Sequence, residues 1–100
     1  MTTIAYSERA RADIVRLTDF LFESDPTAAD TTADLIEEAI AILINHPEIG
    51  RKVGSELREL IISRGRSGYL ALYHFGVRVD EVFVLAIRHQ RESGYGLRLT

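Results

Sequence analysis

Apolar residues in the first half of the chain recur with the period of an α-helix. A short apolar start at Ile4, Ala5 and Tyr6 predicts a strand at the edge of a sheet. Ser7 is a good N-cap, and the stripe behind it predicts a helix that runs to about Ser24. The residues that form this stripe are Ala10, Ile14, Leu17 and Leu21.

A second helical stripe follows almost at once. Asp25 and Pro26 are well suited to the N-cap and the first position of a helix, and Pro47 should end that helix just before it. Ala29, Ala33, Ile36, Ile40 and Leu43 keep the spacing of one helical face. Because the link between the two helices is so short, they are expected to form an antiparallel hairpin.

The second half changes to short runs that are typical of β-strands. Leu57–Ile62 is strand-like but only weakly alternating, whereas Tyr69–Phe75 and Val82–Ile87 are rich in aromatic and β-branched residues. Glycine-containing turns separate the three runs. The segment from Pro47 to Ser55 is predicted to be a loop. The last run is apolar at every position, which predicts a central strand that is buried on both faces.

Together these patterns predict one α+β domain over residues 1–100, with the order β-α-α-β-β-β. Three consecutive strands form an antiparallel meander, and the N-terminal helical hairpin packs on one face of the antiparallel sheet. The first strand pairs at an edge.

Composition narrows the classes of function. The chain has no cysteine, which excludes a disulfide framework and a thiol nucleophile. The N-terminus has no basic start and no long apolar run, and no run approaches the ~20 residues of a membrane span, so we expect a cytoplasmic protein. The three histidines lack metal-ligand spacing and no glycine-rich phosphate loop is present, so neither a metal nor a cofactor is predicted.

The net charge of −3 is unevenly distributed. Residues 1–50 hold ten acidic and three basic groups, whereas residues 51–100 hold five acidic and nine basic groups. This asymmetry suggests an acidic or polyanionic partner for the second half, although solvated faces would give the same count. Eleven of the twelve basic residues are arginine, which suits bidentate contacts to carboxylate or phosphate.

The sharpest candidate site follows the last strand, where Ile87 gives way to Arg88, His89, Arg91 and Tyr95. Metal-free RNA cleavage needs an acid or base and cationic stabilisation of the phosphorane, which His89 and the arginines would supply. Tyr95 would stack on a base or donate a proton. The alternative is that His89 caps the strand edge and Arg91 pairs with a nearby acid.

Three other arginines are candidates for binding. Arg58 lies on a predicted strand and would face either a phosphate, a partner's carboxylate or a surface acid of its own chain. Arg64 and Arg66 lie in a Gly/Ser turn, where they would either reach a phosphate backbone or remain solvated.

The order of several segments resembles the RelE/ParE superfamily of bacterial type II toxins. The matching features include Ala10 and Asp13, the path from Ala39 to Gly50, and three motifs: LREL at 57–60, GYLALYHF at 68–75 and LAIRHQRESGY at 85–95. The last three look most like the plasmid-stabilisation, or ParE-like, branch. The resemblance implies a growth-inhibiting toxin that is encoded with an antitoxin, whose flexible segment wraps and blocks it.

The resemblance leaves the target open, because RelE-like members cut mRNA on the ribosome and ParE-like members poison DNA gyrase. A net-acidic chain with a single lysine lacks the electrostatic drive expected of an RNA cutter, so we favour gyrase and a non-enzymatic action. The alternatives are a ribosome-dependent endoribonuclease and a degenerate toxin retained as an antitoxin-binding module. The catalytic set, if the protein is a ribonuclease, is His89, Arg91, Tyr95 and Arg66. The set expected to bind antitoxin or target is Arg58, Arg64, Arg66, Arg88, His89 and Arg91.

Overall fold

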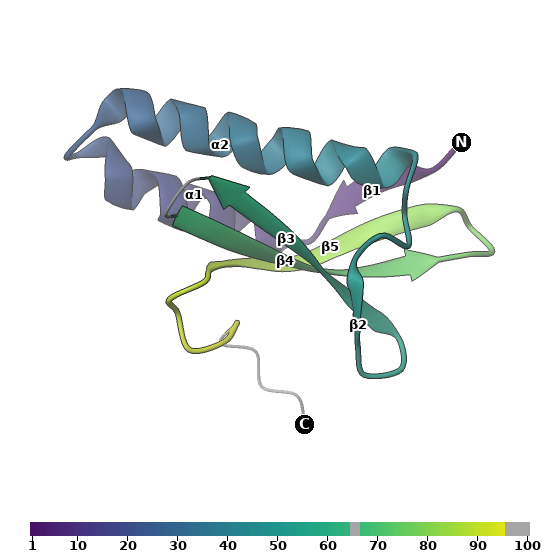
Figure 1. Ribbon diagram of the computed structural model, residues 1–100. Coiled ribbons are helices and arrows are strands. Elements are labelled where there is room, and N and C mark those ends of the chain that lie inside the picture. The colour runs from purple at the N-terminus through teal and green to yellow at the C-terminus, as the bar shows by residue number, and fades with distance from the viewer. Residues whose placement is uncertain (65–66, 96–100) are drawn as a thin grey trace.

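The computed structural model describes residues 1–64 and 67–95 and has the predicted α+β architecture (Figure 1). The helical segments are α1 (Glu8–Phe22), α2 (Pro26–Ala41) and a 3₁₀ turn (Ile42–Ile44). The strands are β1 (Thr3–Tyr6), β2 (Arg51–Val53), β3 (Leu57–Arg64), β4 (Ser67–Gly76) and β5 (Glu81–His89). None of the helices in this described part is long and apolar enough to cross a bilayer.

The helix boundaries follow the predicted capping residues. The Ser7 side chain accepts a hydrogen bond from the Ala10 amide at 2.9 Å, and Asp25 does the same for the Ala28 amide at 3.1 Å. The second helix tightens into the 3₁₀ turn before Pro47 instead of continuing as an α-helix. The predicted helical hairpin is therefore confirmed, and its two helices lie on one face of the sheet (Figure 1).

The sheet is mixed and not purely antiparallel, which corrects the sequence prediction. Its strand order is β1-β5-β4-β3-β2, and β3, β4 and β5 form the expected antiparallel meander. At the edge, however, β1 runs parallel to β5, with Ile4 opposite Val82. No turn joins these two strands, so hairpin geometry does not fix their relative direction. The Ser7 amide and hydroxyl fix it by donating to the carbonyls of Val84 and Leu85, at 2.9 and 2.8 Å.

Two further predictions about the strands were wrong in part. The predicted loop from Pro47 to Ser55 contains the short edge strand β2, which pairs antiparallel with β3 through Lys52 and Arg58. All three residues of β2 are exposed, so no burial pattern marks it in the sequence. Strand β5 does lie between two neighbours, but it is not buried on both faces, because Phe83 is 36% exposed.

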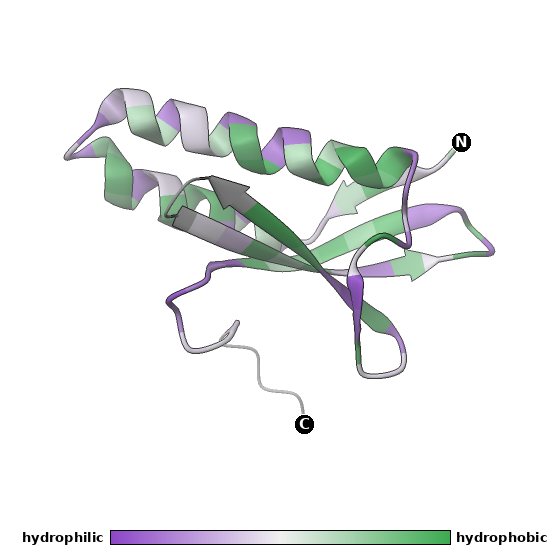
Figure 2. Cartoon of the chain, in the orientation of Figure 1, coloured by the Kyte–Doolittle hydropathy of each residue, from purple (hydrophilic) through white to green (hydrophobic). Residues whose placement is uncertain are grey.

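The core lies between the helices and the sheet. It includes Leu17 from α1, Ile36 and Ile40 from α2, and Tyr73 and Val84 from the sheet. Apolar residues run along the central strands, whereas the segment that follows β5 is mainly polar (Figure 2). Burying this helix-facing side of the sheet supplies most of the apolar burial that stabilises a domain of this size.

The other side of the sheet faces away from the helices, and we call it the open face. Because side chains alternate along strands, the register places Glu59, Leu72 and Ala86 in one row of this face. A second row contains Ile61, Leu70 and Arg88. After β5 the chain turns back below the open face (Figure 1).

Candidate functional site

The end of β5 divides the predicted cluster between the two sides of the sheet. Arg88 lies on the open face, opposite Leu70, whereas His89 lies on the helix side, opposite Tyr69. The rings of His89 and Tyr69 meet edge to face, with centroids 5.2 Å apart. Neighbouring residues of a strand point to opposite faces, so the pleat itself separates these two side chains.

On the open face, Glu59 is the centre of a polar group that also contains Arg51, Arg88 and Tyr95. The Glu59 side chain is buried, and it accepts a 2.5 Å hydrogen bond from the Tyr95 hydroxyl. Arg51 also donates to Glu59, through Nε at 2.8 Å and through a second guanidinium nitrogen. The Arg88 guanidinium lies over the Tyr95 ring, 5.1 Å from its centroid, and donates to the Glu92 carbonyl at 2.7 Å.

These contacts keep the shared proton on the Tyr95 hydroxyl and the negative charge on Glu59. Burial raises the pKa of Tyr95, and the hydrogen bond to the Glu59 carboxylate raises it further. Burial also acts to raise the pKa of Glu59, but the hydrogen bonds from Tyr95 and Arg51 outweigh it, and the pKa of Glu59 is lowered. At neutral pH, Tyr95 is therefore a neutral donor and Glu59 is an anion.

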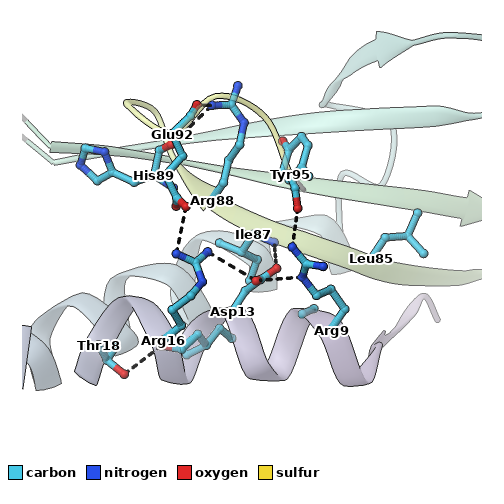
Figure 3. Close-up of polar contacts among 12 residues, drawn as sticks. Arg9, Asp13, Arg16, Thr18, Leu85, Ile87, Arg88, His89, Glu92 and Tyr95 are labelled. Carbon is cyan, nitrogen blue, oxygen red and sulfur yellow. Dashed lines mark hydrogen bonds and ion pairs between the residues drawn. The ribbon is translucent and has the colours of Figure 1, made fainter. Parts of the chain in front are cut away.

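A second polar group seals the edge of β5 beyond the end of β1 (Figure 3). Asp13, on α1, is almost fully buried and accepts a 2.9 Å hydrogen bond from the Ile87 amide. Arg9 and Arg16 flank Asp13, with nitrogen–oxygen distances of 3.1 and 3.4 Å. Further along, Glu92 accepts the His89 amide at 2.9 Å and pairs with Arg16 at 2.9 Å.

Arg9 also binds the segment that follows β5, because it donates to the carbonyl of Tyr95 (Figure 3). The returning segment is therefore attached to α1 through Arg9 and Arg16 and to β3 through the Tyr95 hydroxyl. These contacts place Tyr95 against the open face.

A groove of about 530 Å³ lies between α1 and the paired ends of β4 and β5. We call it the α1 groove. Its apolar lining consists of Leu17, Phe20, Leu21 and Tyr69, and its polar rim consists of Arg16, His89, Arg91 and Glu92. A local hydrogen bond orients the His89 ring, because its Nδ1 atom accepts from the Arg91 amide at 3.1 Å.

The predicted catalytic set is not assembled as one cluster in the described part of the chain. His89 and Arg91 line the α1 groove, whereas Tyr95 binds Glu59 on the open face. Arg66 lies outside the described residues, and so does the side chain of Arg64. Within residues 1–64 and 67–95, no group of three histidine, aspartate or glutamate side chains could hold a metal ion.

Arg58 lies apart from both polar groups, at the start of β3. Its guanidinium donates to the carbonyls of Glu48 and Gly50, both at 2.9 Å, and it lies 3.7 Å from the Glu48 carboxylate. Two of these three contacts are to backbone carbonyls, so in the free protein Arg58 holds the loop before β2.

Sequence reasoning did not identify Glu59 and Asp13 as central residues. A buried acid is unusual unless it is paired, and the partners of Glu59 come from β2 and from the segment after β5. For Asp13 a signal exists, since Arg9 and Arg16 stand four residues before it and three after it, the spacing of neighbours on a helix.

Comparisons with known proteins agree on the superfamily, although some of the matches are named ParE and others RelE. Residues 4–94 match the family model described as the ParE toxin of the type II toxin–antitoxin system parDE. Two proteins of Caulobacter vibrioides are similar in sequence. The first, "Toxin RelE3", is 36% identical over 92% of this chain and 98% of its own length. The second, "Toxin RelE1", is 41% identical over 71% of this chain and 76% of its own length.

Two solved structures are similar in fold. The chromosomal ParDE system from P. aeruginosa superposes with a TM-score of 0.71 at 19% identity, over 89% of this chain and 96% of that one. The intact E. coli RelBE toxin–antitoxin complex superposes with a TM-score of 0.67 at 17% identity, over 92% of this chain and the whole of that one.

Proposed function

The chain belongs to the RelE/ParE superfamily of type II toxins, and from this premise we propose that it binds and inhibits DNA gyrase instead of cutting RNA. We further propose that it acts in the cytoplasm and that a cognate antitoxin neutralises it. Gyrase inhibition is the action that the ParE-like resemblance implies. Family membership alone does not identify the cellular target, because toxins that share this fold act on different targets. The proposal therefore concerns the target.

The observation that carries the proposal is the paired carboxylate on the open face. RNA cleavage without a metal needs cations aimed at the phosphate and an acid or base that is free to exchange a proton. On the open face, the buried carboxylate of Glu59 lies among the arginines that would have to bind the phosphate. Both Arg51 and the Tyr95 hydroxyl are already hydrogen-bonded to this carboxylate. A phosphate that approached this face would meet a carboxylate and a proton donor already in use.

The overall charge supports the same view. A net charge of −3 with one lysine gives a weak counterion-release drive towards ribosomal RNA. A protein target is recognised through local shape and a few buried anchors, and it does not require a basic molecule.

Purified toxin is the test. We expect it to inhibit gyrase supercoiling of relaxed plasmid, and we expect added antitoxin to restore the reaction. The control is primer extension on a translated mRNA, which should show no new 5′ ends. Ribosome-dependent cleavage with unaffected supercoiling would overturn the proposal.

A second candidate function, ribosome-dependent RNA cleavage, is favoured by one contact. Arg88 lies over the Tyr95 ring on the open face, and together they offer a cation for phosphate and a ring for base stacking. If this pair is used, cleavage would be lost in Arg88→Ala and Tyr95→Ala. Tight antitoxin binding with neither activity would instead identify a degenerate toxin kept as a binding module.

A further inference from the structure

We propose that the α1 groove is the docking site for an acidic, amphipathic segment of the cognate antitoxin. The segment would insert an apolar side chain between α1 and the start of β4 and place a carboxylate on the rim. The inference rests on the proposed function only in taking the antitoxin as the partner, and it does not depend on the toxin's target.

The apolar half of the groove is built to receive a side chain. Leu17 and Tyr69 are buried and form a firm floor, with 8% and 5% of their surfaces exposed. Phe20 stands beside them with 82% of its surface exposed, although it lies on the same helix as the core residues Ala10 and Leu17. An aromatic side chain left exposed beside an apolar cavity of this size is typical of a protein-binding surface.

The polar rim selects for negative charge. Arg16 is already occupied by Asp13 and Glu92. The Arg91 side chain is exposed and forms no ion pair with any other described residue, so its guanidinium is available to a carboxylate of the partner. The rim therefore carries one unpaired cation beside an apolar floor, which fits an acidic segment with apolar anchors.

The groove fits a protein segment better than it fits nucleic acid. A nucleic-acid surface presents several cations along a backbone track, whereas this rim offers a single unpaired arginine next to aliphatic and aromatic carbon. A second copy of the toxin is the remaining occupant, and it is distinguished by measuring self-association.

The test uses the full-length toxin and the antitoxin encoded beside it, with affinity measured by isothermal titration calorimetry. We expect Phe20→Ala to weaken binding by about 30-fold, as for a buried aromatic anchor. Arg91→Glu should weaken it by at least about tenfold, because it replaces attraction with repulsion at the rim. Both side chains are exposed in the free protein, so circular dichroism and thermal unfolding should be unchanged.

The chain offers a matched control for each variant. Phe22 is 57% exposed at the end of the same helix but does not line the groove, and Arg78 is an exposed arginine in the turn before β5. Phe22→Ala and Arg78→Glu should bind antitoxin within about threefold of wild type. The inference is overturned if Phe20→Ala and Arg91→Glu bind like these controls. It is also overturned if sedimentation shows a toxin dimer that Phe20→Ala dissociates while antitoxin affinity stays unchanged.

The outcome is separable from that of the gyrase assay. A toxin that fails to inhibit gyrase, but whose Phe20→Ala variant loses antitoxin, refutes the proposed target and supports the docking site. A toxin that inhibits gyrase, and whose Phe20→Ala variant still binds antitoxin normally, refutes only the docking site.

Discussion

Replacing Asp13 by alanine should destabilise the protein by about 2–4 kcal/mol. The substitution removes the acceptor of the Ile87 amide, which is buried at the edge of β5, and an unpaired buried donor costs roughly 1–3 kcal/mol. The two arginines that flank Asp13 lose their ion pairs as well. Their side chains are 43% and 48% exposed and can return to water, so each pair contributes only about 0–1 kcal/mol.

Asp13→Asn is the matched variant, because its carbonyl oxygen can still accept the Ile87 amide. We expect it to cost roughly half as much as Asp13→Ala, since it loses the charge but keeps the buried hydrogen bond. Urea unfolding, monitored by circular dichroism, gives the unfolding free energies of both variants. Equal m-values, which are the slopes of unfolding free energy against urea concentration, would show that the unfolded states are comparable.

Two results would refute the reasoning. A loss below about 1 kcal/mol in Asp13→Ala would mean that water or another group replaces the carboxylate at the strand edge. Equal losses in the alanine and asparagine variants would assign the effect to charge and not to the buried amide.

Two further predictions concern stability. Tyr73→Phe removes a buried hydroxyl that donates to the Pro47 carbonyl and accepts the Gly50 amide, both at 2.9 Å; urea unfolding should show a loss of about 1–3 kcal/mol, whereas Tyr69→Phe should change little. The pKa of Glu59 is lowered in the folded state, so its stabilisation is present above the ordinary pKa of a glutamate and is lost as the pH falls through the lowered value. The difference in unfolding free energy between wild type and Glu59→Gln should therefore shrink as the pH falls from neutral to below the ordinary pKa of a glutamate. A difference that stays constant over this range would contradict the assignment.

Local chemistry explains why the helices could be predicted from the sequence. Ser7 and Asp25 cap their helices through bonds to amides three residues ahead, and such signals lie entirely within one stretch of sequence. The direction of β1 has no such signal, because its partner strand lies at the other end of the chain. Strand β2 was missed because three exposed residues carry no alternation.

The sequence predicted a polar cluster after β5 but not how its residues are arranged. The change from Ile87 to Arg88 marks where β5 leaves the core, and the structure does place both polar groups there. What the pattern could not show is the division of Arg88 and His89 between two faces, with Tyr95 returning to Glu59 on β3. That arrangement depends on the path of the segment after β5, which apolar periodicity does not encode.

The pairing of β1 with β5 also determines when this domain can fold during its synthesis. Strand β1 leaves the ribosome well before β5, which is its hydrogen-bond partner, as the register of Ile4 with Val82 shows. A nascent chain that stops before β5 has no partner for β1 and no strand edge for Asp13 to bind. Closing a loop that spans most of the chain is also entropically slow. The paired strand edge, and with it the buried position of Asp13, can therefore form only after residues 81–89 have been synthesised, so the two helices must wait for β5 before their polar contacts to the sheet are complete.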